Sequence, residues 1–411
     1  MGSTGSIGVQ ALDVIATHPT DFSVVGLAAQ GTRPELLADQ VAATGARRVA
    51  LPDEAAAARV EALLAARRLR PVTLTAGATA VADLAATPCD VVLNAVTGFA
   101  GLTSSLAALR AGTRLALANK ESLVVGGRFL LDRAGPGQLT PVDSEHSAFA
   151  QALRAGRADE VSRLILTASG GPFRGWTRSQ LAHVTAAQAL AHPTWAMGRT
   201  ITINSATLVN KGLELIEASL LFDVPLDAIT VVVHPQSQVH SMVEFRDGAT
   251  LAMASPPDMR LPIALGLAWP HRLGDVIEPC RWDQPTAWTF EPLDETVFPA
   301  VALARRVGRA GGTAPAVFNA ANEVVVDAFC AGQIGFLDIT ATLSAVVDRH
   351  LAPLAPGALG GPGAPTAPDG EAVESAPGRF APDSELSLAV IEAADAWARA
   401  EALGLIDARR G

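Results

Sequence analysis

Three acidic residues in two short segments have the types and spacing of a divalent metal site. The segment PVDSEH places Asp143 and Glu145 two residues apart, and SATLVNKGLE brings Glu214 close to Asn210 and Lys211. On an extended segment, side chains two positions apart point the same way, so Asp143 and Glu145 converge. Convergent carboxylates are the ligands that a hard divalent cation requires. In the alternative interpretation, Asp143 and Glu145 cap a helix and Glu214 is a solvated helix residue.

The segment that contains Glu214 is expected to begin a helix. Asn210 and Glu214 are four residues apart and therefore share a helix face, with Lys211 beside them. An ammonium group and an amide next to a metal-binding carboxylate suit a phosphorylated substrate. The two segments together predict a metal site that acts on a phosphate-bearing molecule.

The charge balance of the chain excludes one broad class of partner. The chain has 411 residues and a formal net charge of −10. Binding to nucleic acid requires clustered Lys and Arg that displace counterions from phosphates, so we expect no nucleic-acid partner. At this length the chain is expected to fold as two or three domains.

Cysteine usage and hydropathy indicate a cytoplasmic protein. Cys89, Cys280 and Cys330 are odd in number and widely spaced, which fits neither a disulfide framework nor a zinc knuckle. The longest apolar runs, such as LPIALGLAW, are shorter than the roughly 20 residues that cross a bilayer, and the amino terminus lacks the basic region of a signal peptide. We expect reduced thiols, no membrane partner and a cytoplasmic location.

Residues 1–142 are expected to form a Rossmann-like, doubly wound α/β domain. Short β-like runs (FSVVGLAA, VVLNAV, RLALAN) alternate with Ala- and Leu-rich helical stretches, which is the pattern of a parallel sheet with crossover helices. The domain opens on GSTGSIG, in which glycine recurs every third residue immediately before a helical run. Such glycines let backbone N–H groups approach a pyrophosphate at a helix N-terminus. A dinucleotide is therefore the expected ligand.

One element of that domain is missing from the pattern. In a dinucleotide-binding fold the glycine turn follows the first strand, whereas only Met1 precedes Gly2. We expect a short β-branched strand upstream of Met1. Without this strand, weak nucleotide binding is expected, and a normal affinity would contradict the expectation.

The rest of the chain divides, on its pattern, into three parts. Residues 143–270 are expected to form a central α+β catalytic domain, residues 271–296 a linker arm with three prolines, and residues 297–411 a carboxyl-terminal helical domain. A stretch at about 352–383 is dense in Pro, Gly and Ala and poor in large apolar residues, which predicts a disordered loop.

Eight motifs occur in one order along nearly the whole chain. They are GSTGSIG, ANKESLV, PVDSEH, SGGPF, HPTWAMGR, SATLVNKGLE, HPQS with VHSMVEF, and NAANEV. Together they closely resemble the 1-deoxy-D-xylulose 5-phosphate reductoisomerase family of the non-mevalonate isoprenoid pathway. The resemblance implies a metal-dependent isomerisation of this sugar phosphate followed by reduction with NADPH to 2-C-methyl-D-erythritol 4-phosphate. It also implies a homodimer with the central domain at the interface.

The family pattern implies a role for each polar residue of these motifs. The metal, which is Mg²⁺, Mn²⁺ or Co²⁺, is implied at Asp143, Glu145 and Glu214, and these acids with Lys120 and His192 make up the implied catalytic set. The residues implied to bind the substrate and its phosphate are Lys120, Ser144, Glu145, Ser169, His192, Trp195, Ser205, Asn210, Lys211 and Glu214.

The loop AHPTWAMGRT resembles the mobile lid of the family, whose closure would exclude water from the site of hydride transfer. The lid of the family usually carries more basic charge. This chain keeps Arg199 but has Ala191 and Thr200 at positions that are often basic. Weaker closure is therefore expected.

The cofactor implied by the resemblance is NADPH. Its implied contacts are Thr4, Gly5, Ser6, Ile7, Gly31, Thr32, Arg33, Asn119, Glu121 and Gly198. In the segment AAQGTRP, Arg33 suits a 2′-phosphate and no acid occupies the position that reads the ribose, so NADPH is expected rather than NADH.

Two other functions stay open. A metal-free NADP-dependent dehydrogenase of a phosphorylated aldehyde would need a nucleophilic cysteine or a His and acid pair near the site, and no cysteine lies in a motif. A non-catalytic dinucleotide-sensing protein would have no reason to keep the three acids together with Asn210 and Lys211.

Overall fold

The computed structural model describes residues 1–69, 71–195, 197–352 and 378–409. The chain divides into two compact units. Unit 1 contains residues 1–123, 130–169 and 228–291, and unit 2 contains residues 124–129, 170–227 and 292–411. The domain boundaries expected from the sequence remain a prediction.

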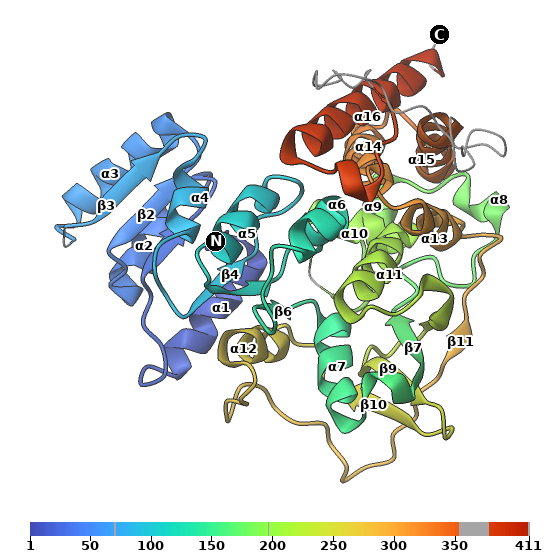
Figure 1. Cartoon of the computed structure of the whole chain (residues 1–411), viewed down its shortest axis with the longest axis horizontal. Helices are drawn as coiled ribbons and strands as arrows, with labels where there is room; N and C mark the ends of the chain where they lie inside the picture. Colours follow the sequence, from blue (N-terminus) through green and yellow to red (C-terminus); the bar gives the residue numbers. More distant parts are fainter. Residues whose placement is uncertain (70, 196, 353–377, 410–411) are drawn as a thin grey trace. The chain divides into compact units, whose positions relative to one another are not determined.

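The amino-terminal part of unit 1 is Rossmann-like, as the alternation of strands and helices predicts (Figure 1, blue to cyan). Its strands form two parallel sheets, in the orders β1-β2-β3 and β4-β5-β6. These strands are β1 (Gly26–Ala28), β2 (Arg48–Leu51), β3 (Thr73–Ala76), β4 (Val91–Asn94), β5 (Arg114–Leu117) and β6 (Leu139–Pro141). The accompanying helices are α1 (Ser6–Thr17), α2 (Pro34–Thr44), α3 (Glu54–Ala66), α4 (Ala80–Ala85), α5 (Gly101–Arg110) and α6 (Lys120–Leu131).

The glycine turn at the start of α1 depends on the absence of side chains. Gly2 has a φ of +75°, and the N–H of Gly5 donates to the carbonyl oxygen of Gly2 at 3.0 Å. A Cβ on Gly8 would lie 2.3 Å from that carbonyl oxygen and 2.5 Å from the Cα of Ser3. The first turn of α1 can therefore pack directly on the turn only because residue 8 is glycine.

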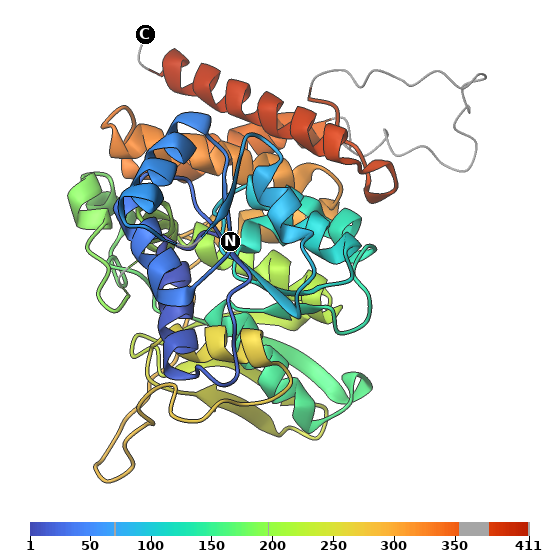
Figure 2. The ribbon, with the colours of Figure 1, turned by 90° about the vertical axis from the view of Figure 1, so that its left-hand side faces the viewer.

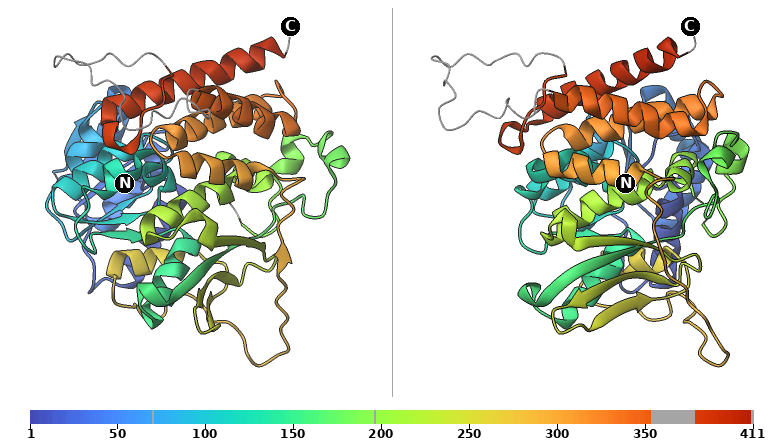
Figure 3. Two further views of the ribbon diagram at one scale, coloured as in Figure 1. Left: turned by 45° about the vertical axis from the view of Figure 1, so that its right-hand side comes forward. Right: turned by 90° about the vertical axis from the view of Figure 1, so that its right-hand side faces the viewer.

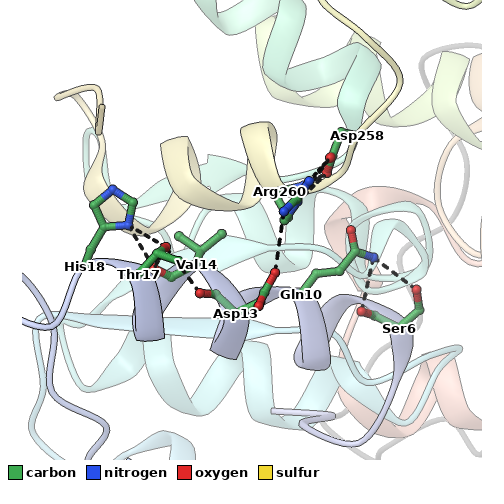
Figure 4. Close-up of polar contacts among 8 residues, drawn as sticks. All are labelled: Ser6, Gln10, Asp13, Val14, Thr17, His18, Asp258 and Arg260. Atoms are coloured by element: carbon green, nitrogen blue, oxygen red, sulfur yellow. Dashed lines mark hydrogen bonds and ion pairs between the residues drawn. The ribbon is translucent and has the colours of Figure 1, made fainter. Parts of the chain in front are cut away.

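Helix α12 (Arg260–Ala268) lies beside α1 in unit 1 (Figures 2 and 4). Near one end of this pair, Arg260 Nη1 is 3.6 Å from Asp13 Oδ2. At the other end, the ring nitrogens of His18 each lie 2.9 Å from a carbonyl oxygen, of Val14 and of Gly274. These carbonyls raise the pKa of His18 because they accept hydrogen bonds from the protonated ring.

A five-stranded sheet of order β10-β9-β7-β8-β11 follows along the chain. Its strands are β7 (Val161–Ala168), β8 (Ile229–Val233), β9 (Val239–Phe245), β10 (Thr250–Ala254) and β11 (Glu291–Pro292). Strand β7 pairs in parallel with β8 and antiparallel with β9. Helix α7 (Ser144–Ala152) packs on β9 and β10 and continues through the 3-10 turns η1 (Leu153–Ala155) and η2 (Ala158–Glu160) into β7.

Unit 2 is helical, which confirms the expected helical carboxyl-terminal part (Figure 3, orange and red). Its helices are α8 (Arg178–Leu181), α9 (Ala186–Ala189), α10 (Arg199–Thr207), α11 (Val209–Phe222), α13 (Ala300–Ala310), α14 (Ala314–Cys330), α15 (Phe336–Leu351) and α16 (Leu388–Ala408), with the 3-10 turns η3 (Leu226–Ala228) and η5 (Asp383–Glu385). Helix α14 packs against both α15 and α16.

Polar contacts link α16 to α10 through α14. The guanidinium of Arg399 lies 2.6 Å from both Glu323 and Asp395. Asn322, the residue directly before Glu323 in α14, donates from Nδ2 to Asn204 Oδ1 of α10 at 3.0 Å. Both asparagines are almost fully buried, so losing either partner leaves a buried polar group unsatisfied.

Most of the loop predicted at 352–383 lies outside the described residues. Its last residues are held by the start of α14 and the end of α15. The N–H of Thr313 donates to Ala381 O at 2.9 Å, and Gly312 N donates to Asp383 Oδ1 at 2.9 Å. His350 Nδ1 lies 3.1 Å from Gly378 O. The predicted disorder therefore does not extend to 378–383.

Over the described ranges, every helix falls short of the length and apolar character needed to cross a membrane.

The packing of α1 on the glycine turn can be tested by comparing alanine substitutions at two helical glycines, Gly8 at the turn and Gly404 far from it in the sequence. Replacing Gly404, an exposed residue of α16 with open space around it, by Ala should stabilise the protein by about 0.5–1 kcal/mol, since alanine loses less backbone entropy. The same change at Gly8 should destabilise it by about 1–3 kcal/mol because the new methyl group meets backbone atoms. Urea denaturation compares the two variants, and equal stabilisation by both would contradict the turn geometry.

Candidate active site

The acidic residues of PVDSEH lie at the start of a helix. Asp143 is the N-cap of α7, its Oδ1 accepts from Ser144 N at 3.0 Å, and Glu145 is in the first turn. The expectation of an extended segment is therefore wrong, and the capping interpretation is right about the local structure. The two side chains still converge, since a carboxylate oxygen of each lies within 4.8 Å of the other. Both charges also benefit from the positive end of the helix dipole.

A lysine neutralises the first of these acids. Lys120, the first residue of α6, forms an ion pair with Asp143, and the two side chains are only 9% and 16% exposed. The Oγ of Ser144 donates to Glu145 Oε2 at 2.6 Å. This arrangement fixes two carboxylates and one ammonium group at a shielded position in unit 1.

One residue near Asp143 was missed from the sequence. A ring nitrogen of His146 lies within 4.8 Å of an Asp143 carboxylate oxygen, and His146 is fully buried. The available signal was its position, three residues after Asp143 and therefore on the same side of the first turn of α7.

The predicted cofactor residues of unit 1 surround the glycine turn and the ends of β1 and β5. Arg33 donates from Nη2 to the carbonyl oxygen of Thr4, so the guanidinium reaches the turn itself. Gly31 has a φ of +86°, and a Cβ there would lie 2.5 Å from Ala56 Cβ. The remaining predicted residues of the turn and its neighbour, Gly5, Ser6, Ile7 and Thr32, are partly or fully exposed.

The segment after β5 is held by one asparagine. Asn119 Oδ1 accepts from Ser122 N at 2.6 Å, and its Nδ2 donates to Gly98 O at 3.0 Å. Asn119 is 2% exposed and therefore acts here as a structural residue that orders the start of α6. Glu121 lies in the first turn of that helix.

In unit 2, the segment SATLVNKGLE spans the junction of two helices. Helix α11 begins at Val209, which confirms the helix predicted from the spacing of Asn210 and Glu214. Leu208, between α10 and α11, has a φ of +61°, a conformation that is uncommon for a residue with a side chain. This turn sets the direction of α11, and strained backbone of this kind is often found at functional sites.

Glu214 is enclosed rather than solvated. It is 1% exposed, and its two oxygens accept from Asn210 Nδ2 and from the ammonium group of Lys211, which is itself buried. The interpretation of Glu214 as a solvated helix residue is therefore wrong. A buried carboxylate is tolerated because an opposite charge and an amide compensate it.

His192 organises the predicted lid segment. Its Nδ1 accepts from the backbone N–H groups of Thr194 and Trp195, at 3.1 and 2.9 Å. The ring is therefore neutral with its proton on Nε2, which lies 3.1 Å from Ser205 Oγ. Burial lowers the pKa of His192 and favours the same neutral form. Gly198 is the N-cap of α10.

Two further predicted residues lie beside this segment. Arg199, the first residue of α10, forms an exposed ion pair with Asp327 of α14. Ser169 directly follows β7, and after it Gly170 and Gly171 have φ values of +83° and +65°. A Cβ on Gly171 would lie 2.9 Å from Ser205 O, so the glycine permits a close approach to α10.

The sequence carries a further signal for Lys120 and Lys211. Of the 31 Lys and Arg residues, these two are the only lysines, and the other 29 are arginine. This chain has arginine at every other basic position and lysine only at the two positions that are paired with predicted metal ligands. Lysine and arginine are not interchangeable where a point charge must fit a confined site.

Family models match three stretches of the chain. Residues 1–127 match the 1-deoxy-D-xylulose 5-phosphate reductoisomerase model, residues 139–222 its C-terminal domain model, and residues 254–401 the DXP reductoisomerase C-terminal domain model.

Curated relatives and solved structures agree with these models. The chain is 57% identical over 408 residues to a 1-deoxy-D-xylulose 5-phosphate reductoisomerase of Cutibacterium acnes, covering 98% of this chain and 96% of the relative. It is 55% identical over 413 residues to that of Beutenbergia cavernae, covering 99% and 96%.

Two solved structures cover nearly the whole fold. The reductoisomerase from Zymomonas mobilis in complex with NADPH has a TM-score of 0.83 at 39% identity, covering 98% of this chain and 97% of that one. A DOX-P reductoisomerase in complex with NADPH, fosmidomycin and magnesium has a TM-score of 0.87 at 33% identity, covering 100% and 98%. The chain belongs to the 1-deoxy-D-xylulose 5-phosphate reductoisomerase family.

Proposed function

We propose that this protein is a metal- and NADPH-dependent oxidoreductase that isomerises 1-deoxy-D-xylulose 5-phosphate and reduces it to 2-C-methyl-D-erythritol 4-phosphate for isoprenoid precursor synthesis. The observation that carries the proposal is a lysine–carboxylate ion pair that occurs twice. At the start of α7 and again at the start of α11, a predicted metal ligand is paired with one of the two lysines of the chain. The names of the close relatives support the same activity.

The residues fit a hard divalent cation. Asp143, Glu145 and Glu214 offer only oxygen, the donor set preferred by Mg²⁺ and Mn²⁺. We propose that these three hold the ion together, and that Co²⁺ can replace it. When bound, the cation would polarise substrate oxygens and stabilise negative charge that develops on them.

The lysines have two tasks in this proposal. In the protein without a metal, Lys120 and Lys211 compensate Asp143 and Glu214. With a dication bound, Asp143 and Glu214 would no longer need Lys120 and Lys211 for this compensation, and both ammonium groups would be available to the substrate. Lys211, with Ser169, Ser205 and Asn210, then binds the phosphate, because an ammonium group, two hydroxyls and an amide supply donors for its oxygens.

The other substrate contacts follow from the same residues. Lys120, Ser144 and Glu145 face the sugar hydroxyls, and Lys120 can carry a proton there. The Nε2–H of neutral His192 donates to a substrate oxygen in place of Ser205, and Trp195 covers the carbon backbone and excludes water. Glu214 completes the set at the metal side.

NADPH is the proposed cofactor of unit 1. Thr4, Gly5, Ser6 and Ile7 bind the pyrophosphate at the start of α1, where the helix dipole favours an anion. Gly31, Thr32 and Arg33 hold the 2′-phosphate. The contact from Arg33 to the turn supports this role. Asn119, Glu121 and Gly198 are proposed to border the ribose and nicotinamide.

We further propose a homodimer and a cytoplasmic location. Leu251 on the edge strand β10, Trp282 in the arm and Phe290 before β11 are exposed by 40%, 71% and 43%, which suits a surface covered by a second copy. A monomer by sedimentation equilibrium would contradict the dimer.

Cys89, Cys280 and Cys330 are all free, as in a reducing compartment, and recovery in an exported fraction would contradict the location.

Little favours a metal-free dehydrogenase that acts through a cysteine. Burial raises the pKa of all three thiols, which disfavours the reactive thiolate.

The activity is tested by NADPH oxidation at 340 nm with 1-deoxy-D-xylulose 5-phosphate, before and after chelation. We expect turnover that requires added Mn²⁺ or Mg²⁺. Asp143→Asn and Glu214→Gln should keep the fold and reduce kcat by at least about 100-fold, because each removes a ligand charge where charge develops. Asp348→Asn, which alters an exposed ion pair with Arg306, is the control. Turnover that survives chelation would reject the metal assignment.

The proposed transfer of the lysines from the carboxylates to the substrate on metal binding, here called the lysine exchange, predicts opposite effects of one substitution on two ligands. Lys211→Gln leaves Glu214 without its cation, so Mn²⁺ should bind about tenfold more tightly, while the substrate should bind at least about tenfold more weakly. Calorimetry with Mn²⁺ alone separates the two effects.

Reductive ¹³C-methylation keeps the charge and labels only Lys120, Lys211 and the terminal amine, so both lysine signals should shift on Mg²⁺ addition. Unchanged signals would reject the exchange.

Cofactor choice tests the role of Arg33. Arg33→Ala should lower kcat/KM for NADPH at least about tenfold and leave that for NADH nearly unchanged, because only NADPH carries the 2′-phosphate. Arg67→Ala, at another exposed arginine of unit 1, is the control. Equal losses with both cofactors would show that Arg33 does not bind the 2′-phosphate.

A further inference from the structure

The motif NAANEV in α14 contributes no residue to the proposed site, yet both of its asparagines are buried. Asn319 and Asn322 are each 1% exposed. Asn319 Nδ2 donates to Glu323 Oε1 at 3.1 Å, so this contact stays within α14. Glu323 in turn accepts from Arg399 of α16 at 2.6 Å. Asn319 and Glu323 therefore serve the packing of α14 with α16.

Asn322 reaches a different helix. Its Nδ2 donates to Asn204 Oδ1 of α10 at 3.0 Å, and Asn204 is 3% exposed. The Oδ1 of Asn322 is buried and has no hydrogen-bond partner among the described residues. The bond to Asn204 thus offsets only part of the cost of burying this amide, which an apolar pair of similar size would avoid. This cost points to a role besides stability.

Helices α10 and α14 also meet at a second point. Arg199 at the start of α10 pairs with Asp327 of α14, so the two helices run in opposite directions. These two side chains are 57% and 64% exposed, and exposed ion pairs contribute little to stability. The amide contact is therefore the one that holds the last turn of α10 against α14.

The last turn of α10 is braced by local hydrogen bonds. Thr207 Oγ1 donates to Asn204 O at 3.2 Å and accepts from the N–H of Val209, the first residue of α11, at 3.4 Å. Leu208 N donates to Ser205 O at 3.2 Å. A movement of Asn204 is thus passed on to the junction of α10 and α11.

Three of the four residues proposed to bind the substrate phosphate lie at this junction. Ser205 directly follows Asn204, and Asn210 and Lys211 lie in the first turn of α11. Several donors can bind one ligand together only if each is held to within about 0.5 Å. The position of Asn204 therefore affects three donors at once.

We propose that Asn322 is a positioning residue for the substrate phosphate. Through Asn204 it fixes the last turn of α10, so that the donors on both sides of the junction converge on one phosphate. The inference rests on the function proposed above and extends it to a residue of α14 outside the set of substrate contacts. Loss of the contact should weaken substrate binding beyond any effect on the fold.

Single substitutions test the contact. Asn322→Ala and Asn204→Ala each remove it, and each should raise KM for 1-deoxy-D-xylulose 5-phosphate at least about tenfold, while KM for NADPH stays within about twofold. Asn204→Asp keeps an oxygen acceptor for Asn322 Nδ2 and should leave both KM values nearly unchanged. Asn319→Ala is the matched control, because it removes an equally buried asparagine whose hydrogen bond stays within α14.

A double variant separates positioning from stability. Asn204→Ala combined with Asn322→Ala leaves neither amide, so it should recover at least about half of the Tm lost by either single variant and still keep the raised KM. A KM that returns to normal with Tm would overturn the proposal. Equal KM values for Asn322→Ala and Asn319→Ala would also overturn it. If Asn322→Ala does not fold, Asn204→Ala and the double variant give the same comparison.

Failure of the inference can be told from failure of the proposed function. If the unsubstituted protein does not turn over 1-deoxy-D-xylulose 5-phosphate, the proposed function is rejected and the inference with it. Normal turnover by the unsubstituted protein, with an unchanged KM in Asn204→Ala and in the double variant, rejects the inference alone.

Discussion

The compensation of buried negative charge is the constraint on which the candidate site depends. A carboxylate that leaves water needs an opposite charge or several hydrogen-bond donors. At α7 the helix start and Lys120 meet this need for Asp143, and at α11 Asn210 and Lys211 meet it for Glu214. Each helix therefore folds with its acid in place before any ligand is bound.

This constraint explains which parts of the site the sequence predicts. The helix at Asn210 and Glu214 was predictable because their spacing is a local property of the chain. The burial of Glu214 was not, since it arises from the packing of nearly every residue of α11 from Val209 to Ala218. The geometry of Asp143 was misjudged because a two-residue spacing fits both an extended segment and a helix start, and only the capping hydrogen bond distinguishes them.

The fold was easier to predict from the sequence than the contacts within it. Alternating strands and helices predicted the Rossmann-like part, and helical periodicity predicted α13 to α16. Contacts between distant segments, such as Arg33 with Thr4 or Asn322 with Asn204, follow no local pattern. They depend on where tertiary packing places the ends of elements, which a single sequence does not state.

The link from α16 through α14 to α10 bears on how the protein is made. Helix α10 begins at residue 199 and α16 at residue 388, so the ribosome completes the first long before the second. Until Arg399 reaches Glu323, the helix that holds Asn322 against Asn204 lacks one of its supports. The part of unit 2 that contains α10 and α11 therefore gains this support only after synthesis is nearly finished.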